Sequence, residues 1–179
     1  VKNRYILLFN ETNHGQEWGG AADPYSYAEV AVSFAKELKR RNSDYKIMLG
    51  GLDAAAPQQP PRFMDSAYYL DVVIQEIGVN QYEELFDPLA SHSYPNPGFI
   101  GSPTGSGKGT VRSYEFELDQ LRRLGVQKQL PVFITETGWD GTRIGRERTA
   151  ELYREVFEKV WMPDDRIRAV TPFILNYQG

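Results

Sequence analysis

Residues 131–139 read PVFITETGW, an apolar run that ends in a glutamate, a glycine and a tryptophan. The part from Pro131 to Thr135 is short, apolar and rich in β-branched and aromatic residues, which predicts a strand buried on both faces. Glu136 follows at the carboxyl end of that strand. Barrel enzymes carry their catalytic groups at this end of their parallel strands. The stretch therefore predicts a strand of an α/β fold and a candidate catalytic residue.

Similar apolar runs elsewhere in the chain predict further strands, at Tyr5–Phe9, Lys46–Gly50, Phe86–Ser91 and Ala169–Leu175. Between the strands, apolar residues return every three or four positions, as they do on one face of a helix. These segments predict helices at 27–38, 62–77, 113–124 and 149–160, with Gly78 and Gly125 as C-terminal caps of the second and third. Strands that alternate with helices in this way are typical of a parallel sheet covered by helices.

Two architectures fit this order, an open doubly wound sheet and a closed barrel. A doubly wound nucleotide fold is expected to have a glycine-rich turn after its first strand, whereas Tyr5–Phe9 is followed by Asn-Glu-Thr-Asn. Polar residues follow several different strands instead, which favours the (β/α)8 barrel, or TIM barrel. A complete barrel has eight strands and roughly 250 residues. We therefore expect residues 1–179 to form one domain, a partial TIM barrel with five of the strands.

Composition argues against several classes of partner. The net charge is -4 and the basic residues are scattered among acids, so we expect no nucleic-acid partner. There is no cysteine and there are two histidines, so we expect no metal site and no cofactor. No run of 18 apolar residues predicts a membrane span. Residues 1–4 lead into a strand without a charged-then-apolar leader, which leaves localisation open, with an extracellular or periplasmic place slightly favoured.

A second glutamate, Glu11, follows the first predicted strand in the stretch Phe9-Asn10-Glu11-Thr12-Asn13. Hydrolysis of a glycosidic bond needs two carboxyl groups that face each other across the bond, one as a proton donor and one as an anion. Glu11 and Glu136 lie 125 positions apart and can meet only if the sheet curls round. A single glutamate at a strand end is as often a solvated loop residue, but two such residues favour a catalytic pair.

Both motifs resemble those of clan A of the glycoside hydrolases. Asn10-Glu11 is similar to the Asn-Glu pair that ends the fourth barrel strand, where the glutamate is the acid/base. Residues 135–139 resemble the seventh-strand motif that carries the nucleophile. Ser91-His92-Ser93-Tyr94-Pro95 is similar to the sixth-strand His-x-Tyr element, whose histidine and tyrosine help to position the nucleophile and line the subsite.

The resemblance extends over almost the whole chain, as strands four to eight in order. Leu49-Gly50-Gly51 fits the fifth strand, and Thr171 to Asn176 fits the eighth. The clan commonly has proline after the acid/base glutamate, where this chain has Thr12, and this weakens the family assignment more than the activity. The first three strands are missing, which implies that the N-terminal part of the barrel is supplied in cis or by a separate chain.

The resemblance implies a retaining glycoside hydrolase that cleaves a β-linked O-glycosidic bond in an oligo- or polysaccharide. Glu136 would attack the anomeric carbon, and Glu11 would act first as acid and then as base in a double displacement. Substrate contacts would come from polar and aromatic side chains near the two glutamates: Asn10, on the sugar 2-OH, and His92, Tyr94, Trp139 and Trp18. Trp161 is expected to be a packing residue, and His14 either a loop residue or a sugar contact.

Two other interpretations stay open. A catalytically silent carbohydrate-binding or scaffold barrel would have the same fold, although the presence of both glutamates favours the enzyme. Residues 101–110 (GSPTGSGKGT) look like a phosphate-binding loop around Lys108, but the pattern requires Gly at 102 and Ser or Thr at 109, where the chain has Ser102 and Gly109. A flexible loop that borders the sugar cleft is the better interpretation, and a nucleotide-dependent enzyme is the weakest of the three.

Overall fold

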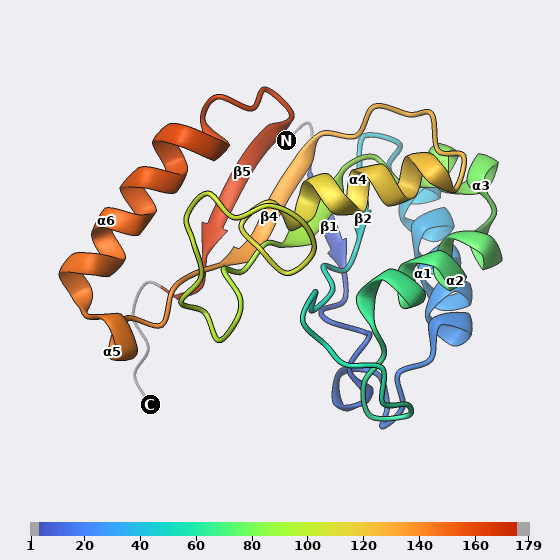
Figure 1. Ribbon diagram of the computed structural model, residues 1–179. Helices are drawn as coiled ribbons and strands as arrows, with labels where there is room; N and C mark the ends of the chain where they lie inside the picture. The colour runs from blue at the N-terminus through green and yellow to red at the C-terminus, as the bar shows by residue number, and fades with distance from the viewer. Residues whose placement is uncertain (1–3, 175–179) are drawn as a thin grey trace.

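The computed structural model describes residues 4–174, which contain five parallel strands. They are β1 (Tyr5–Leu8), β2 (Lys46–Leu49), β3 (Leu89–His92), β4 (Val132–Thr137) and β5 (Ile167–Pro172). β1 pairs with β2, and β4 pairs with both β3 and β5. Between β2 and β3, the backbone N–H of Asp87 donates to the Ile47 carbonyl oxygen at 2.8 Å, and Asp53 pairs in parallel with His92. The strands therefore follow one another in chain order (Figure 1).

The helices are α1 (Pro24–Arg41), α2 (Ser66–Ile77), α3 (Val79–Leu85), α4 (Ser113–Arg123), α5 (Gly141–Ile144) and α6 (Arg146–Val156), with a 3-10 turn η1 (Gly15–Glu17) and a π-helical turn η2 (Phe157–Trp161). The carboxylates of Asp23 and Asp65 accept backbone N–H groups at the first turns of α1 and α2, which is a strong helix start signal. Figure 1 shows α1 to α3 beside β1 and β2, and α6 beside β5.

The five predicted strands are present in the predicted order, and Gly78 and Gly125 follow α2 and α4 with φ of 79° and 104°. Some helix and strand boundaries differ from the predicted ones, because local hydrogen bonds set where these elements begin. α2 begins at Ser66 instead of residue 62 because Asp65 caps it. β3 begins at Leu89 because Phe86 still donates its N–H to the Tyr82 carbonyl oxygen at the end of α3. The short helices α3 and α5 were not expected from the sequence.

Two strands at the carboxyl end of the chain also differ from expectation. β4 continues to Thr137, so Glu136 lies inside the strand and not just after it. β5 begins at Ile167 and ends at Pro172, whereas a strand was expected at Ala169–Leu175 and the eighth-strand motif at Thr171 to Asn176. Residues 175–179 lie outside the described residues, as do residues 1–3.

The strand array is curved and, within residues 4–174, open. The rings of Tyr5 on β1 and Phe133 on β4 have their centroids 4.6 Å apart, although two strands lie between them. In a flat sheet, three strand spacings of about 4.8 Å would separate such residues by roughly 14 Å. The array therefore curls as a section of a barrel would. Each of β1 and β5 has one strand neighbour among the described residues, and closure into a full barrel is not seen.

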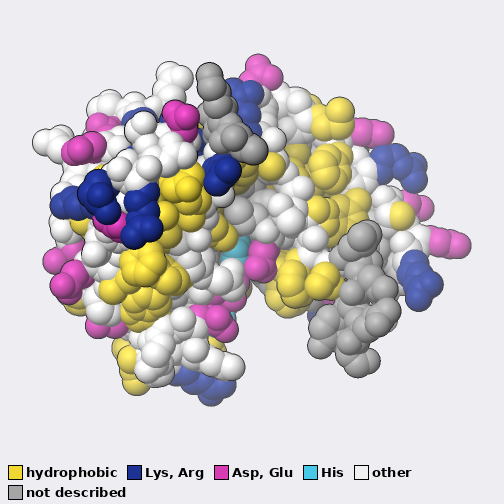
Figure 2. All heavy atoms as spheres, turned by 180° about the vertical axis from the view of Figure 1, so that it is seen from behind, with side chains coloured by type: hydrophobic (Ala, Val, Ile, Leu, Met, Phe, Trp, Pro, Cys, Tyr) yellow, Lys and Arg dark blue, Asp and Glu magenta, His cyan; other side chains and the backbone are white. Residues whose placement is uncertain are grey.

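The core lies between the strands and the helices. Its buried members come from both layers: Ile47, Val132 and Ile134 from the strands, and Ala31, Ala35, Tyr69, Val73, Ile74, Leu118 and Leu121 from the helices. Other large apolar side chains stay exposed, including Tyr5, Phe34 and Phe99. Figure 2 shows apolar side chains in several separate patches on the face seen from behind. The helix side of the array thus holds the packed core, while Tyr5 on β1 is exposed.

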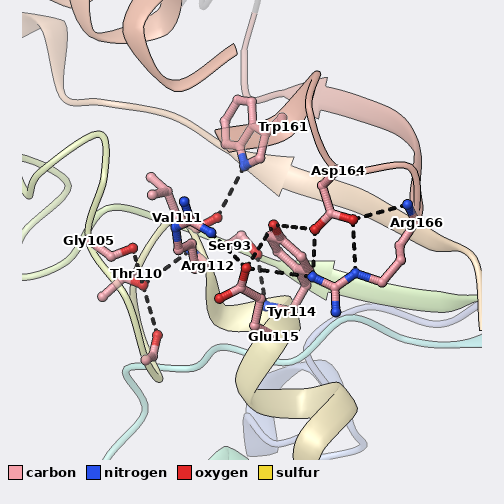
Figure 3. A network of polar contacts seen from close by, with 11 residues as sticks. Ser93, Gly105, Thr110, Val111, Arg112, Tyr114, Glu115, Trp161, Asp164 and Arg166 are labelled. Carbon is pink, nitrogen blue, oxygen red and sulfur yellow. Dashed lines mark hydrogen bonds and ion pairs between the residues drawn. The ribbon is translucent and has the colours of Figure 1, made fainter. Parts of the chain in front are cut away.

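A polar network ties the start of α4 to the turn before β5 (Figure 3). Arg166 donates to Asp164 through Nε at 2.8 Å and Nη2 at 2.6 Å, and Tyr114 donates its hydroxyl to the same carboxylate at 3.0 Å. The Arg166 guanidinium lowers the pKa of Asp164 to about 2. Trp161 is buried and donates its indole N–H to the Val111 carbonyl oxygen at 3.1 Å, which confirms its expected packing role.

One buried carboxyl group in the helix layer makes stability depend on pH. Glu117 of α4 is buried, and its Oε2 has no hydrogen-bond partner in the described part of the chain. Burial raises the pKa of Glu117 from about 4.5 to about 7, although the Ser91 hydroxyl and His92 act in the opposite direction. Below about pH 4.5 this group adds no penalty to folding, because it is protonated in both states. As the pH rises from about 4.5 to about 7 the penalty grows, because the unfolded chain loses a proton that the folded chain still holds.

The shift predicts that Glu117 costs about 3 kcal/mol of stability at pH 8 relative to pH 4. A Glu117→Gln variant should lose this pH dependence and exceed the wild type in free energy of unfolding at pH 8. Urea unfolding at a series of pH values measures the difference. Glu76→Gln, at an exposed position of α2, is the matched control and should keep the wild-type pH dependence. Parallel profiles for the wild type and Glu117→Gln would show that Glu117 does not titrate in this range.

Candidate active site

Glu11 is placed by a strained turn at the carboxyl end of β1. The strand ends at Leu8, and both Phe9 and Glu11 have positive φ, 73° and 41°, a region that side chains with a Cβ rarely adopt. The N–H of Glu11 donates to the Gly51 carbonyl oxygen at 3.0 Å, which fixes the turn against the end of β2. Strain of this kind clusters at functional sites. Asn10 lies within the turn and is exposed.

Buried Asn13 fastens the loop that follows Glu11, a role that the sequence did not reveal. Its side-chain amide donates to the carbonyl oxygens of Asp53 and Met64, each at 3.0 Å, and its Oδ1 accepts the N–H of Asp53 at 3.1 Å. Next to it, His14 and the Asp53 carboxylate lie 2.8 Å apart, and the His14 ring packs edge-on against Phe63. His14 is thus held as a loop residue.

His92 lies between the two glutamates. A register shift after Ser91 pairs His92 with Glu136 across β3 and β4. Its Nδ1 lies 2.9 Å from Oε1 of Glu11, and its Nε2 lies 3.9 Å from Oε1 of Glu136. Glu11, His92 and Glu136 each offer one atom within 4.8 Å of the other two. The sequence led us to expect that His92 positions Glu136, whereas its hydrogen bond in the structure is to Glu11.

Tyr94 holds the other glutamate. Its hydroxyl donates to Oε2 of Glu136 at 2.9 Å. Burial raises the pKa of Tyr94 above its ordinary value, and the Glu136 carboxylate raises it further. The phenol therefore stays protonated near neutral pH and remains a donor to Glu136. The structure thus places Tyr94 where the sequence expected a residue that positions Glu136.

Gly51 makes room for the imidazole of His92. A Cβ at position 51 would lie 2.2 Å from Cδ2 and 2.5 Å from Nε2 of His92, far inside van der Waals contact. His92 is 1% exposed, and its Nε2 has no hydrogen-bond partner among residues 4–174. A side chain at position 51 would displace His92 from both glutamates. The sequence motif Leu49-Gly50-Gly51 marked the strand but gave no sign of this role.

A pocket of about 250 Å³ is lined by Tyr94, Phe99, Gly138, Trp139, Asp140 and Phe173. It is connected to Glu136 through Tyr94, whose hydroxyl bonds the Glu136 carboxylate. Trp139, which was expected to be the main platform for the sugar, forms one wall of the pocket. Two contacts hold its side chain in place. Its indole N–H donates to the Gly101 carbonyl oxygen at 2.9 Å, and its ring packs edge-on against Tyr153. The tryptophan therefore faces the pocket from a rigid position.

Trp18, another expected substrate contact, does not line this pocket. Its ring packs edge-on against Phe9 and Tyr27, with centroids 5.1 Å and 5.3 Å away, and its indole N–H donates to Ser26 Oγ at 2.8 Å. Among the described residues, no hydrogen bond joins Trp18 to Glu11 or Glu136. In this structure Trp18 has the contacts of a packing residue.

The loop at residues 101–110 is held by its own contacts. The ammonium group of Lys108 pairs with the carboxylate of Asp65, which caps α2. Thr110 Oγ1 donates within the loop, and Gly105 is one of its acceptors, at 3.1 Å (Figure 3). An acidic partner at Lys108 disfavours the binding of a phosphate there.

Glu11, His92 and Glu136 form a donor set that could also hold a divalent cation. All three residues already make a hydrogen bond, since Glu11 bonds to His92 and Glu136 bonds to Tyr94. The arrangement fits paired acid/base chemistry more directly.

None of the helices within residues 4–174 is long and apolar enough to cross a membrane.

Comparison with known proteins finds structures of similar fold but no protein of similar sequence. No protein-family model matches the sequence, and no similar curated protein was found. Among solved structures, the chain is similar to AbfB, a family 51 α-L-arabinofuranosidase from Bifidobacterium longum, with a TM-score of 0.59, 16% identity and coverage of 94% of this chain and 37% of that one. It is also similar to a GH128 (subgroup V) exo-β-1,3-glucanase from Cryptococcus neoformans, with a TM-score of 0.55, 13% identity and coverage of 94% and 55%.

Both neighbours are glycoside hydrolases, and the chain shares their α/β fold with parallel strands. The chain spans between about a third and just over a half of the length of these structures. At such low identity the likeness concerns the fold alone. The function has to be argued from the site.

Proposed function

We propose that the chain is the part of a retaining glycoside hydrolase, strands four to eight of a (β/α)8 barrel, that carries both catalytic carboxylates. Glu136 would be the nucleophile and Glu11 the acid/base. The observation that carries this proposal is the approach of their carboxylate oxygens to within 4.8 Å of each other at the carboxyl ends of parallel strands. Retaining glycosidases place these groups about 5 to 5.5 Å apart and inverting ones about 6.5 to 9.5 Å apart.

In the first step, Glu136 attacks the anomeric carbon while the glycosidic C–O bond breaks. Tyr94 donates to Oε2 of Glu136 and so orients the carboxylate, which leaves Oε1 as the attacking oxygen. Protonated Glu11 gives its proton to the leaving oxygen. The products of this step are a glycosyl ester on Glu136, a free hydroxyl on the leaving group and a Glu11 carboxylate.

In the second step, water attacks the same carbon, its proton passes to Glu11, and the ester bond to Glu136 breaks. His92 is compatible with both charge states of Glu11, because a protonated Nδ1 can donate to Oε1 over the same 2.9 Å contact while Oε2 carries or releases the catalytic proton. Two displacements at one carbon restore the original configuration. Asn10, exposed beside Glu11, is proposed to bond the sugar 2-OH.

We propose an oligo- or polysaccharide substrate with a β-linked bond. Support comes from the aromatic pocket that Tyr94 connects to Glu136, because aromatic rings bind the C–H faces of sugars. The activities named for the two structural neighbours, an α-L-arabinofuranosidase and an exo-β-1,3-glucanase, indicate which compounds to test first. The remaining strands of the barrel are proposed to come from the rest of the same polypeptide or from a separate chain.

The proposal predicts that the protein hydrolyses at least one aryl glycoside or β-1,3-glucan oligosaccharide with retention. Turnover is measured on a panel of p-nitrophenyl β-D-glycosides, p-nitrophenyl α-L-arabinofuranoside and laminari-oligosaccharides, and the first-formed anomer is identified by proton NMR. A 2-deoxy-2-fluoro glycosyl fluoride of the best substrate should label Glu136, as peptide mass spectrometry would show. Binding of the oligosaccharides without turnover or labelling would instead indicate a catalytically silent carbohydrate-binding barrel.

A further inference from the structure

Phe99 is an exposed aromatic residue in a strained backbone conformation close to the glutamate pair. Its φ is 58°, in the left-handed region, and its side chain is 44% exposed. Its ring packs edge-on against Tyr94 at 5.0 Å between centroids, and Tyr94 bonds Glu136. A left-handed phenylalanine costs roughly 1 to 3 kcal/mol, and such strain persists where the surrounding structure enforces it. Neither the motifs nor the proposed mechanism gives Phe99 a role.

Three hydrogen bonds enforce this conformation, and all of them use the backbone of residues 98–101. The N–H of Asp140 donates to the Phe99 carbonyl oxygen, Arg143 Nη1 donates to that of Gly98, and Trp139 Nε1 donates to that of Gly101, each at 2.9 Å. The loop after β3 is thereby attached to the segment after β4. Because the Phe99 side chain takes no part in these bonds, its exposure above the pocket is not explained by loop folding.

The pocket that Phe99 borders has the size and chemistry of a site for one neutral ring. Its volume of about 250 Å³ is just below the roughly 300 to 1,000 Å³ of pockets for drug-sized ligands. Four of its six lining residues are aromatic, and Asp140 is the one charged residue among them. None of the described residues that line the pocket is Lys, Arg or His, so an acidic sugar would meet a carboxylate and no cation from them.

The position of the pocket indicates which part of a saccharide it would hold. It lies on the side of Glu136 and Tyr94, at the ends of β3, β4 and β5, whereas Glu11 comes from β1. In double displacement the nucleophile attacks the ring on the glycone side, and the acid faces the departing oxygen. The pocket is therefore on the glycone side of the bond.

We propose, on the basis of the proposed function, that this pocket binds the neutral sugar ring attacked by Glu136, and that Phe99 is a specificity-determining residue that contacts the apolar face of that ring. Phe99 and Trp139 are two aromatic walls of one pocket, and their mutual position is fixed by the bond from the Trp139 indole to Gly101. Phe99 contributes binding and takes no part in proton transfer or attack.

The test compares the wild type with Phe99→Ala, Phe99→Tyr and the control Tyr68→Ala, which changes an exposed ring on α2. With the neutral p-nitrophenyl glycoside that is cleaved fastest, Phe99→Ala should raise KM about tenfold and change kcat less than about twofold, because the contact is present before and during the reaction. Phe99→Tyr should stay within about twofold of the wild-type KM, and Tyr68→Ala should not change it. The p-nitrophenyl glycoside of the matching uronic acid should be a poor substrate.

A second measurement separates this inference from the proposed function. Binding of laminaritriose is followed by tryptophan fluorescence in the same four proteins, without any need for turnover. Weaker binding by Phe99→Ala alone supports the pocket assignment, even in a protein that hydrolyses nothing and so refutes the proposed function. An active enzyme in which Phe99→Ala leaves both KM and laminaritriose affinity unchanged would overturn the role of Phe99. Equal use of the neutral and uronic substrates would overturn the proposed preference for neutral sugars.

Discussion

Replacement of Glu136 by alanine should lower kcat by roughly 10⁴-fold or more on every substrate, because no other group can form the glycosyl ester. Added azide should restore part of the turnover, since a small anion fits the space left by the side chain. It would attack once, from the face opposite to the leaving group, and the product should be the α-glycosyl azide of a β-glycoside. Rates are measured with an aryl glycoside, and the azide product is identified by NMR.

The matched control for this experiment is Glu147→Ala, which removes an exposed glutamate from the first turn of α6. It should keep the wild-type rate and respond to azide no more than the wild type does. A Glu136→Ala protein with wild-type activity would end the glycosidase hypothesis. A β-configured azide product from Glu136→Ala would show that the roles of Glu11 and Glu136 are interchanged.

Replacement of Glu11 by alanine should separate the two steps. An activated aryl leaving group needs no proton, so formation of the glycosyl ester should stay close to the wild-type rate, while its hydrolysis should slow by roughly 10² to 10⁴-fold for want of a base. The ester on Glu136 should accumulate as a burst of the released phenol. Azide should relieve the slow step and give a product of retained β configuration, because it attacks the glycosyl ester and not the substrate.

A substrate with a poor leaving group provides the internal control for Glu11→Ala. Its first step depends on the missing proton, so the variant should be slow on it and show no burst. Equal losses on activated and unactivated substrates would mean that Glu11 does not act as a general acid. The burst, the leaving-group dependence and the azide product are three independent readouts of one assignment.

The sequence was sufficient to predict the strands and to select the two glutamates. Strand order follows from apolar runs such as Tyr5–Phe9 and Pro131–Thr135, whose length and composition are local properties of the chain. Glu11 and Glu136 were selected because each ends such a run, and the structure brings them together. Their catalytic roles stay predictions, which the variants above test.

The supporting residues could not be predicted because their roles depend on contacts across the fold. Gly51 matters through the space it leaves for His92, and Asn13 through bonds to Asp53 and Met64, up to 51 positions away. The hydrogen bond from His92 to Glu11 was not predicted, because it joins residues 81 positions apart on β3 and on the turn after β1. Phe99 gives no signal in the sequence, since its conformation is imposed by hydrogen bonds from another loop.

The strands form two hydrogen-bonded groups, β1-β2 and β3-β4-β5, and a small movement between the groups would change the distance between the two glutamates. Glu11 moves with the β1-β2 ribbon and Glu136 with the β3-β4-β5 ribbon, and the two ribbons meet through the pairing of Asp53 with His92 and the bond from Asp87 to Ile47. A hinge motion of only one or two ångströms at this seam would carry the carboxylates out of retaining geometry. The N–H of Asp87 donates to Ile47 across this junction, so amide hydrogen exchange at Asp87 would report how often the two parts, and with them the two glutamates, separate.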